Sequence, residues 1–103
     1  MTALQSWGRA RVYSPPRLLK SKTNETFISV VLEFERRPRG FAQRIELRSW
    51  QAQDVDRIDK IQIGVMIKFR GEADAVVMVG AESKVYANPR VTGRIVKIYG
   101  GES

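Results

Sequence analysis

With 103 residues and a formal charge of +7, the chain has room for one domain around one modest core. Its 18 Lys and Arg against 11 Asp and Glu predict an acidic partner, most commonly nucleic acid; an anionic membrane surface, an acidic protein or charge kept for solubility are the alternatives. The absence of Cys and His excludes disulfides, thiolate or imidazole metal sites and the usual general base, so we expect no metal, no cofactor and no enzymatic activity.

The first strand is predicted in the stretch GRARVYS, where small or apolar residues alternate with basic ones. Ala10 and Val12 can then face a core while Arg9 and Arg11 face outward. A long connection is predicted for residues 14–26, because two prolines and a run of polar residues break the alternation there.

The second and third strands are predicted to form an antiparallel hairpin. Residues 26–37 are rich in β-branched and aromatic residues, and residues 41–50 alternate in the segment RIELRSW. The turn between them, residues 36–40, holds a proline, a glycine and three arginines. The inner parity is Ile28, Val30, Leu32, Phe34, Ile45, Leu47 and Ser49, and the outer parity of the third strand is Arg44, Glu46, Arg48 and Trp50.

A short helix is predicted in residues 51–64, since Val55, Ile58 and Ile61 recur at intervals of three and Gly64 stands where a helix C-terminus is expected. Strand character then resumes. Residues 65–73 place Val65, Ile67 and Phe69 on one face and Met66, Lys68 and Arg70 on the other, and two further runs follow around the turn at residues 80–83, the last over about 91–99.

The predicted order is three strands, a short helix and two further strands. A small all-β domain would expose two sheet edges unless its sheet closes on itself. We therefore predict an all-β fold, a five-stranded OB-fold barrel with a short helix between strands 3 and 4, as a single domain over residues 1–103. The SH3-like barrel is the competing small barrel, but it has no internal helix at this position.

Residues 44–73 resemble the central segment of bacterial- and phage-type single-stranded DNA-binding proteins. In that family the third strand ends in an aromatic residue, as at Trp50, and a short helix leads to a strand between glycines, as in IGVMIKFRG. VVLEF is similar to the family's second strand, and the likeness extends over about residues 8–99. It implies an OB-fold and single-stranded DNA as the partner. The chain departs from the family in carrying Arg44 where members often have a tryptophan, and in ending at Ser103 without an acidic C-terminal tail.

A single strand is held by cations that follow its phosphates and by aromatic rings on which its bases stack. Trp50 is the predicted platform and Arg48 the neighbouring phosphate contact; packing of Trp50 against the helix or a second subunit is the alternative. For Arg44 and Arg48 the alternative is an ion pair with Glu33 or Glu35. Arg9, Arg11, Lys68 and Arg70 are expected on the outer face of strands that neighbour the third strand or each other, and the fourth strand is expected to share the outer face of the third. Solvation is the alternative for these cations and for those of the turn, and packing is the alternative for the other aromatics. The predicted nucleic-acid-binding set is Trp50, Arg48, Arg44, Lys68, Arg70, Arg9, Arg11, Arg37, Arg39, Phe27 and Tyr86.

The predicted function is non-catalytic, largely sequence-independent binding of single-stranded DNA in replication, recombination or repair. An RNA-binding or primosome-type OB module, and an OB-fold adaptor whose basic face binds an acidic protein, are the alternatives. The carboxylates of Asp54 and Asp56 argue little for catalysis, because residues two apart on a helix do not share a face and no nucleophile–base set accompanies them.

A homodimer or homotetramer is expected, because the run AVVMV at residues 75–79 does not alternate and another subunit would cover it. The alternative cover is the chain's own barrel. No apolar run approaches the roughly 20 residues of a membrane span, and the N-terminal residues lack the apolar stretch of a signal peptide. We therefore expect a cytoplasmic protein, or one of the host cytoplasm if the chain is viral, with no membrane partner.

Overall fold

The computed structural model of the chain describes residues 4–36, 43–74 and 90–99. Strands dominate this described part, and the one α-helix in it is short. In chain order the elements are β1 (Leu4–Val12), β2 (Arg17–Lys20), β3 (Thr26–Glu33), β4 (Arg44–Ser49), α1 (Ala52–Asp56), the 3-10 helix η1 (Ile58–Lys60), β5 (Met66–Asp74) and β6 (Arg90–Tyr99).

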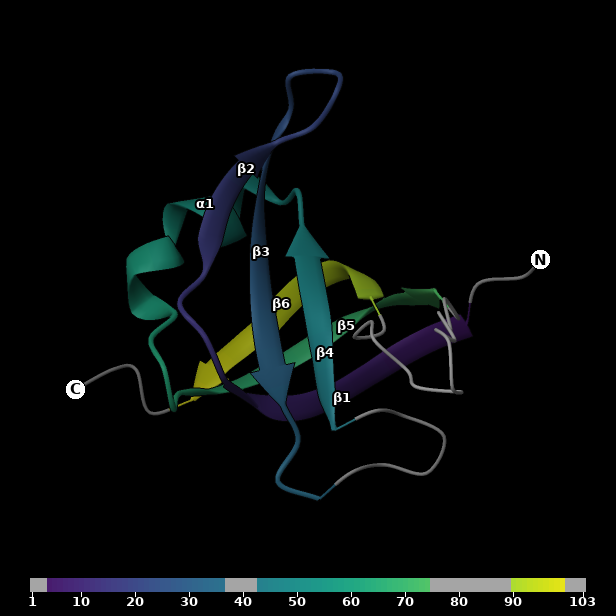
Figure 1. Cartoon of the computed structure of the whole chain (residues 1–103), viewed down its shortest axis with the longest axis vertical. Helices are drawn as coiled ribbons and strands as arrows, with labels where there is room; N and C mark the ends of the chain where they lie inside the picture. The colour runs from purple at the N-terminus through teal and green to yellow at the C-terminus, as the bar shows by residue number, and fades with distance from the viewer. Residues whose placement is uncertain (1–3, 37–42, 75–89, 100–103) are drawn as a thin grey trace, which may run out of the picture.

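The strands form a ring. They are hydrogen-bonded in the order β1-β5-β6-β4-β3-β2, and a further pairing of β1 with β3 closes the ring without β2. Neighbours are antiparallel except β4 and β6, which run parallel. Figure 1 shows β3 and β4 crossing in front of β1, β5 and β6. The predicted five-stranded OB-fold barrel is confirmed. In chain order, α1 lies between the third and fourth strands of the barrel, which are β4 and β5.

The long connection predicted for residues 14–26 contains a strand, β2, which the sequence pattern missed. β2 pairs with Thr26–Ser29 of β3, and β1 pairs with Leu32 and Glu33 on the same edge. β2 therefore continues the path of β1 after the break at the two prolines. Prolines cannot donate to a ladder, and four residues are too few to show alternation, so the sequence indicated only a loop.

The barrel interior is filled by the side chains that alternation in the sequence predicted to face inward. Among these inward-facing residues of the hairpin, Ser49 is polar and buried. Phe34 and Phe69 lie in the core with their ring centroids 6.3 Å apart. The core consists of Ala10, Val12, Ile28, Val30, Leu32, Phe34, Ile45, Leu47, Ile61, Ile67, Phe69, Val91 and Ile95.

The predicted helix is present but short. Val55 and Ile58 pack against the core and Ile61 is buried, so the spacing of three correctly predicted the face that turns inward. In the described part of the chain, no helix is long and apolar enough to cross a membrane.

Gly64 does not end the helix, contrary to the prediction. α1 ends at Asp56 and η1 at Lys60, whereas Gly64 lies in the turn before β5 with a φ of +90°. Its N–H donates to the carbonyl oxygen of Val12 at 2.9 Å. Glycine adopts a positive φ without the steric cost of a Cβ, so the sequence marked a turn there but not which turn.

The buried carboxylate of Asp54 fastens α1 to two strands. Its Oδ2 accepts a hydrogen bond from the Ser49 hydroxyl at 2.6 Å and one from the backbone N–H of Ile95 at 2.9 Å. Its Oδ1 accepts one from the guanidinium of Arg57 at 2.9 Å. A buried acid is tolerated where its oxygens are satisfied in this way.

Two glycines let the backbones of β5 and β6 approach closely. Gly71 and Gly93 are register partners. A Cβ on Gly71 would meet the carbonyl oxygen of Thr92, and a Cβ on Gly93 would meet that of Arg70. The close approach therefore requires glycine at both positions.

Candidate nucleic-acid interface

Trp50 lies on the outer surface directly after β4 and stacks on Phe27 of β3. Their ring centroids are 4.3 Å apart and their planes differ by 22°. The register of the hairpin explains the contact, because Ile28 pairs with Ser49, and Phe27 and Trp50 are the residues next to that pair on the two strands. Trp50 is half-buried, whereas Phe27 is 5% exposed. Phe27 is thus not a second open platform, as the predicted set had it, but a support for the indole ring.

Arg48 lies beside this aromatic pair. Its guanidinium carbon is 5.3 Å from the centroid of the Phe27 ring, which is within the range of a cation–π contact. Its Nε donates to Glu46 at 2.8 Å. The partner is therefore a carboxylate of its own strand, not Glu33 or Glu35 as the alternative had it.

A cleft of about 330 Å³ opens next to Arg48 on the outer face of β3 and β4. Its floor carries Glu46, surrounded by cations. Arg90 reaches it because β4 and β6 run parallel with Glu46 and Arg90 in register. The residues that line the cleft are Ser14, Pro15, Arg17, Ser29, Val31, Glu46, Arg48 and Arg90.

Glu46 holds the cleft together. Its Oε2 accepts from the Ser29 hydroxyl at 2.6 Å and from Arg48 at 2.8 Å, and its Oε1 accepts from Arg90 at 3.4 Å. Burial raises the pKa of the Glu46 carboxyl, but the hydrogen bond from Ser29 and the hydrogen bond and charge of Arg48, with a bond from Arg90, lower it by more. The carboxyl is therefore ionised at neutral pH, and three arginines against one carboxylate leave the cleft positive.

Sequence reasoning missed Arg17 and Arg90 as part of this site. Arg17 was assigned to a connection, but it begins β2 beside Ser29. Arg90 is brought to Glu46 by a parallel pairing between strands that are separated by α1 and β5. No local pattern carries that register, so only the closed barrel identifies Arg90.

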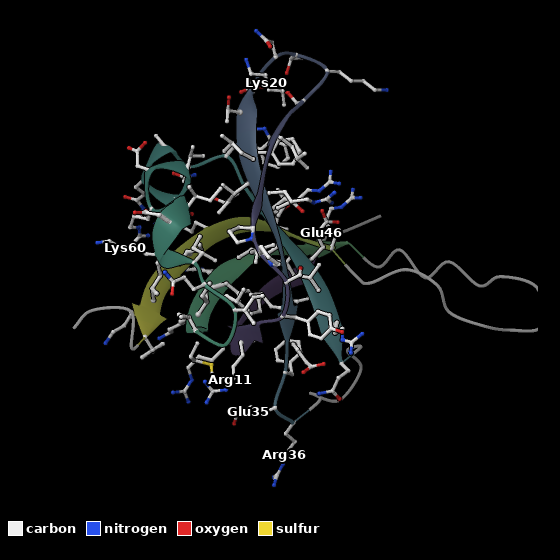
Figure 2. The ribbon with its side chains drawn as sticks, turned by 60° about the vertical axis from the view of Figure 1, so that its left-hand side comes forward. Arg11, Lys20, Glu35, Arg36, Glu46 and Lys60 are labelled. Atoms are coloured by element: carbon white, nitrogen blue, oxygen red, sulfur yellow. The ribbon has the colours of Figure 1, made fainter. Side chains whose placement is uncertain are left out.

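Arg44 and Arg11 are already paired with carboxylates. Arg44 donates to Glu33 at 3.0 Å, as the ion-pair alternative predicted, and its guanidinium lies 3.8 Å from the centroid of the Tyr13 ring. Arg11 donates to Glu35 at 2.6 Å, and Figure 2 shows this pair at the end of the molecule opposite Lys20. Exposed pairs of this kind are weak, so both guanidinium groups can exchange a carboxylate for a phosphate.

Arg9, Lys68 and Arg70 do not lie on one face with Arg48. This contradicts the expectation that the third and fourth predicted strands, now β4 and β5, share an outer face. The three residues lie on β1 and β5, and β6 separates β5 from β4. Arg9 and Lys68 are register partners of each other, which agrees with the other part of the expectation, that these strands neighbour each other.

Three members of the predicted set, Arg37, Arg39 and Tyr86, lie outside the described residues. The apolar run at residues 75–79, which motivated the expected oligomer, lies outside them too.

Comparisons with known proteins identify the fold. No protein-family model matches the sequence, and no curated protein matches it. Among solved structures, a small single-stranded DNA-binding protein from Streptomyces coelicolor is similar at a TM-score of 0.68 and 12% identity, over 95% of this chain and 94% of that one.

A mitochondrial single-stranded DNA-binding protein of S. cerevisiae is similar at a TM-score of 0.67 and 11% identity, over 94% of this chain and 97% of that one. A Plasmodium falciparum single-stranded DNA-binding protein in complex with single-stranded DNA is similar at a TM-score of 0.61 and 15% identity, over 95% and 93%. These likenesses cover 94–95% of this chain and 93–97% of the other chain in each comparison. The chain therefore has the OB-fold in the form found in single-stranded DNA-binding proteins.

Proposed function

We propose that this chain binds single-stranded DNA without catalysing a reaction, and largely without regard to base sequence. The observation that carries the proposal is the half-buried Trp50–Phe27 stack beside a cleft that holds three arginines. Single strands are bound by this combination of an aromatic platform and nearby cations. The structural neighbours, which are single-stranded DNA-binding proteins, support it further.

In this proposal one base stacks on the exposed side of the Trp50 indole. Phe27 fixes the plane of that ring, so little side-chain freedom is lost when the base arrives. A phosphate of the same strand contacts Arg48 and its neighbours in the cleft. Stacking uses a surface that every base has, and phosphates carry no sequence information, which makes the binding tolerant of sequence.

The proposal places the chain in replication, recombination or repair of DNA, as a homodimer or homotetramer in the cytoplasm. Repeated barrels in one assembly would let a single strand contact several Trp50 platforms and gain apparent affinity without new kinds of contact.

The test is Trp50→Ala, titrated with oligo-dT by fluorescence anisotropy. We expect a loss of roughly 1–3 kcal/mol of binding free energy, the contribution of one stacked base. Trp50→Phe is the matched control and should lose less, because a phenyl ring still stacks on Phe27. Circular dichroism verifies that both variants are folded.

An unchanged affinity of folded Trp50→Ala would contradict the proposal. Matched oligo-U and a polyglutamate chain are the competing ligands. Tighter binding of oligo-U would favour an RNA-binding module, since RNA differs by its 2′-hydroxyls, and tighter binding of polyglutamate would favour an adaptor for acidic proteins.

A further inference from the structure

Strand β6 connects the cleft to a second cationic surface. It begins at Arg90 in the cleft, where it lies between β4 and β5, and it pairs with β5 along its whole length. Arg94 and Lys97, both exposed, follow Arg90 along the same strand. From residue 90 to residue 97 a strand advances roughly 23 Å.

A β-bulge keeps Arg94 and Lys97 on the same outer face. Residues three apart on a regular strand point to opposite faces. Here the register shifts between Lys68 and Phe69, so that Lys68 pairs with Lys97 while Phe69 pairs with Ile95. The extra residue in β6 lets Ile95 enter the core and returns Lys97 to the outside.

The register then aligns cations across three strands. Arg9 of β1 pairs with Lys68 of β5, which pairs with Lys97 of β6. In the next row Arg70 pairs with Arg94. Side chains in such register lie roughly 5 Å apart at their Cβ atoms, and like charges placed there destabilise a sheet.

The arginines of these rows differ from those elsewhere on the barrel in their carboxylate contacts. Within the described residues Arg9, Arg70 and Arg94 form no ion pair, whereas Arg11, Arg44 and Arg48 each form one. Lys97 lies over the ring of Tyr99, at 4.8 Å from its centroid. Glu72, the next outward residue of β5 after Arg70, pairs in register with Thr92 and not with a cation of β6.

We propose that the outer face of β6, with the neighbouring cations of β5 and β1, is a phosphate track that extends the single-stranded DNA site. The inference rests on the proposed function. The DNA strand that places a phosphate beside Arg90 and a base on Trp50 continues along β6, past Arg94 to Lys97. A second copy of this chain does not fit the face, because a symmetric contact would oppose one set of cation rows to the other.

The experiment compares Arg94→Glu and Lys97→Glu with Lys60→Glu. The last makes the same change as Lys97→Glu, on the exposed 3-10 helix, and Figure 2 shows Lys60 on the helical side of the barrel, away from Glu46. Each protein is titrated with oligo-dT of about 6 and about 16 nucleotides, the range of single-barrel site sizes.

For the long oligonucleotide we expect Arg94→Glu and Lys97→Glu each to bind roughly tenfold more weakly and to lose about one unit of salt slope. For the short one we expect a change of less than about twofold, because it occupies only the Trp50 platform and the cleft. Lys60→Glu should bind both oligonucleotides like the wild type.

Four outcomes would overturn the track. If Arg94→Glu and Lys97→Glu bind the long oligonucleotide as tightly as the wild type, these residues do not lie on the path. If they lose equal affinity for both lengths, or if Lys60→Glu loses as much affinity as they do, the effect is one of overall charge. A sedimentation mass altered by Lys97→Glu would assign the face to assembly. Failure of the proposed function is distinct, since it shows as an unchanged short-oligonucleotide affinity in Trp50→Ala.

Discussion

Glu46 sets the charge of the cleft, because its carboxylate contacts both Arg48 and Arg90. Glu46→Gln keeps the shape of the side chain and an oxygen that accepts from Ser29, but it removes the negative charge. We expect single-stranded DNA to bind roughly twofold to fivefold more tightly, the equivalent of a partly exposed ion pair. Anisotropy titration with oligo-dT measures it. Weaker binding would instead mean that Glu46 serves the site by orienting the two guanidinium groups.

The same residue predicts how stability responds to pH. In the folded chain the pKa of Glu46 is below the usual 4.5, so its contribution is complete above the pKa of the unfolded chain and is lost as pH falls through the folded pKa. We expect the free-energy difference between wild type and Glu46→Gln to be constant near neutrality and to shrink below about pH 4. Urea unfolding of both proteins at pH 7 and at pH 3 checks this. A stability difference that is larger at pH 3 than at pH 7 would contradict a lowered pKa of Glu46 in the folded chain.

At the level of single residues, the sequence predicted which side chains face outward but not which of them meet. Alternation in RIELRSW correctly placed Arg48 and Trp50 on the outside. The partners Phe27 and Arg90 depend on strand register, which is a property of the folded sheet. The contact with Phe27 could have been predicted from the hairpin, since both of its strands were predicted. That with Arg90 required the parallel contact of β4 with β6.

At the level of elements, α1 is fixed to the barrel by polar contacts that hydrophobic spacing does not reveal. Asp54 receives hydrogen bonds from Ser49 of β4, from Ile95 of β6 and from Arg57 just after the helix. In the sequence Asp54 and Asp56 look equivalent, but in the structure Asp54 is fully buried and Asp56 is exposed. Burial and partners decide their roles, and neither is encoded in the local pattern.

This difference gives a paired prediction. Asp54→Ala should lower the free energy of unfolding by roughly 3–5 kcal/mol, because the Ile95 N–H and the Ser49 hydroxyl are left buried without an acceptor. Asp56→Ala should change it by less than about 0.5 kcal/mol. Urea denaturation followed by circular dichroism compares the two. Equal losses would mean that helix propensity, not the buried hydrogen bonds, dominates at both positions.

The order of the elements other than β2 was predictable because hydrophobic periodicity changes from two to three and back along the chain. The closed barrel followed from the cost of open edges. The neighbours of β5 did not follow: the sequence suggested that the third and fourth strands of the barrel share a face, whereas β6 separates β4 from β5. That error put Lys68 and Arg70 beside Arg48, although their strand, β5, lies behind β3 and β4 in Figure 1.

At the level of the whole molecule, the described cations and carboxylates are arranged differently on the two layers of the barrel. On β3 and β4, arginines alternate with carboxylates that pair with them. On β1, β5 and β6, the cations lie in like-charged rows. In the proposed site, the first layer presents the aromatic stack with a moderated charge, and the second supplies a positive field that attracts phosphates from a distance.

Assembly is the prediction that belongs to this scale. β1 pairs with β3 only at Arg11 and Val12, so on that side Leu4–Ala10 has no partner among the described strands. An unpaired edge is a template for another strand, and we expect a homodimer or a tetramer built from dimers. Since the cation rows oppose self-contact, the interface should avoid them, and Arg94→Glu should leave the mass unchanged. Sedimentation equilibrium at micromolar concentration decides: the mass of one chain, with and without oligo-dT, would refute the oligomer, and a mass changed by Arg94→Glu would place the interface on the cationic layer.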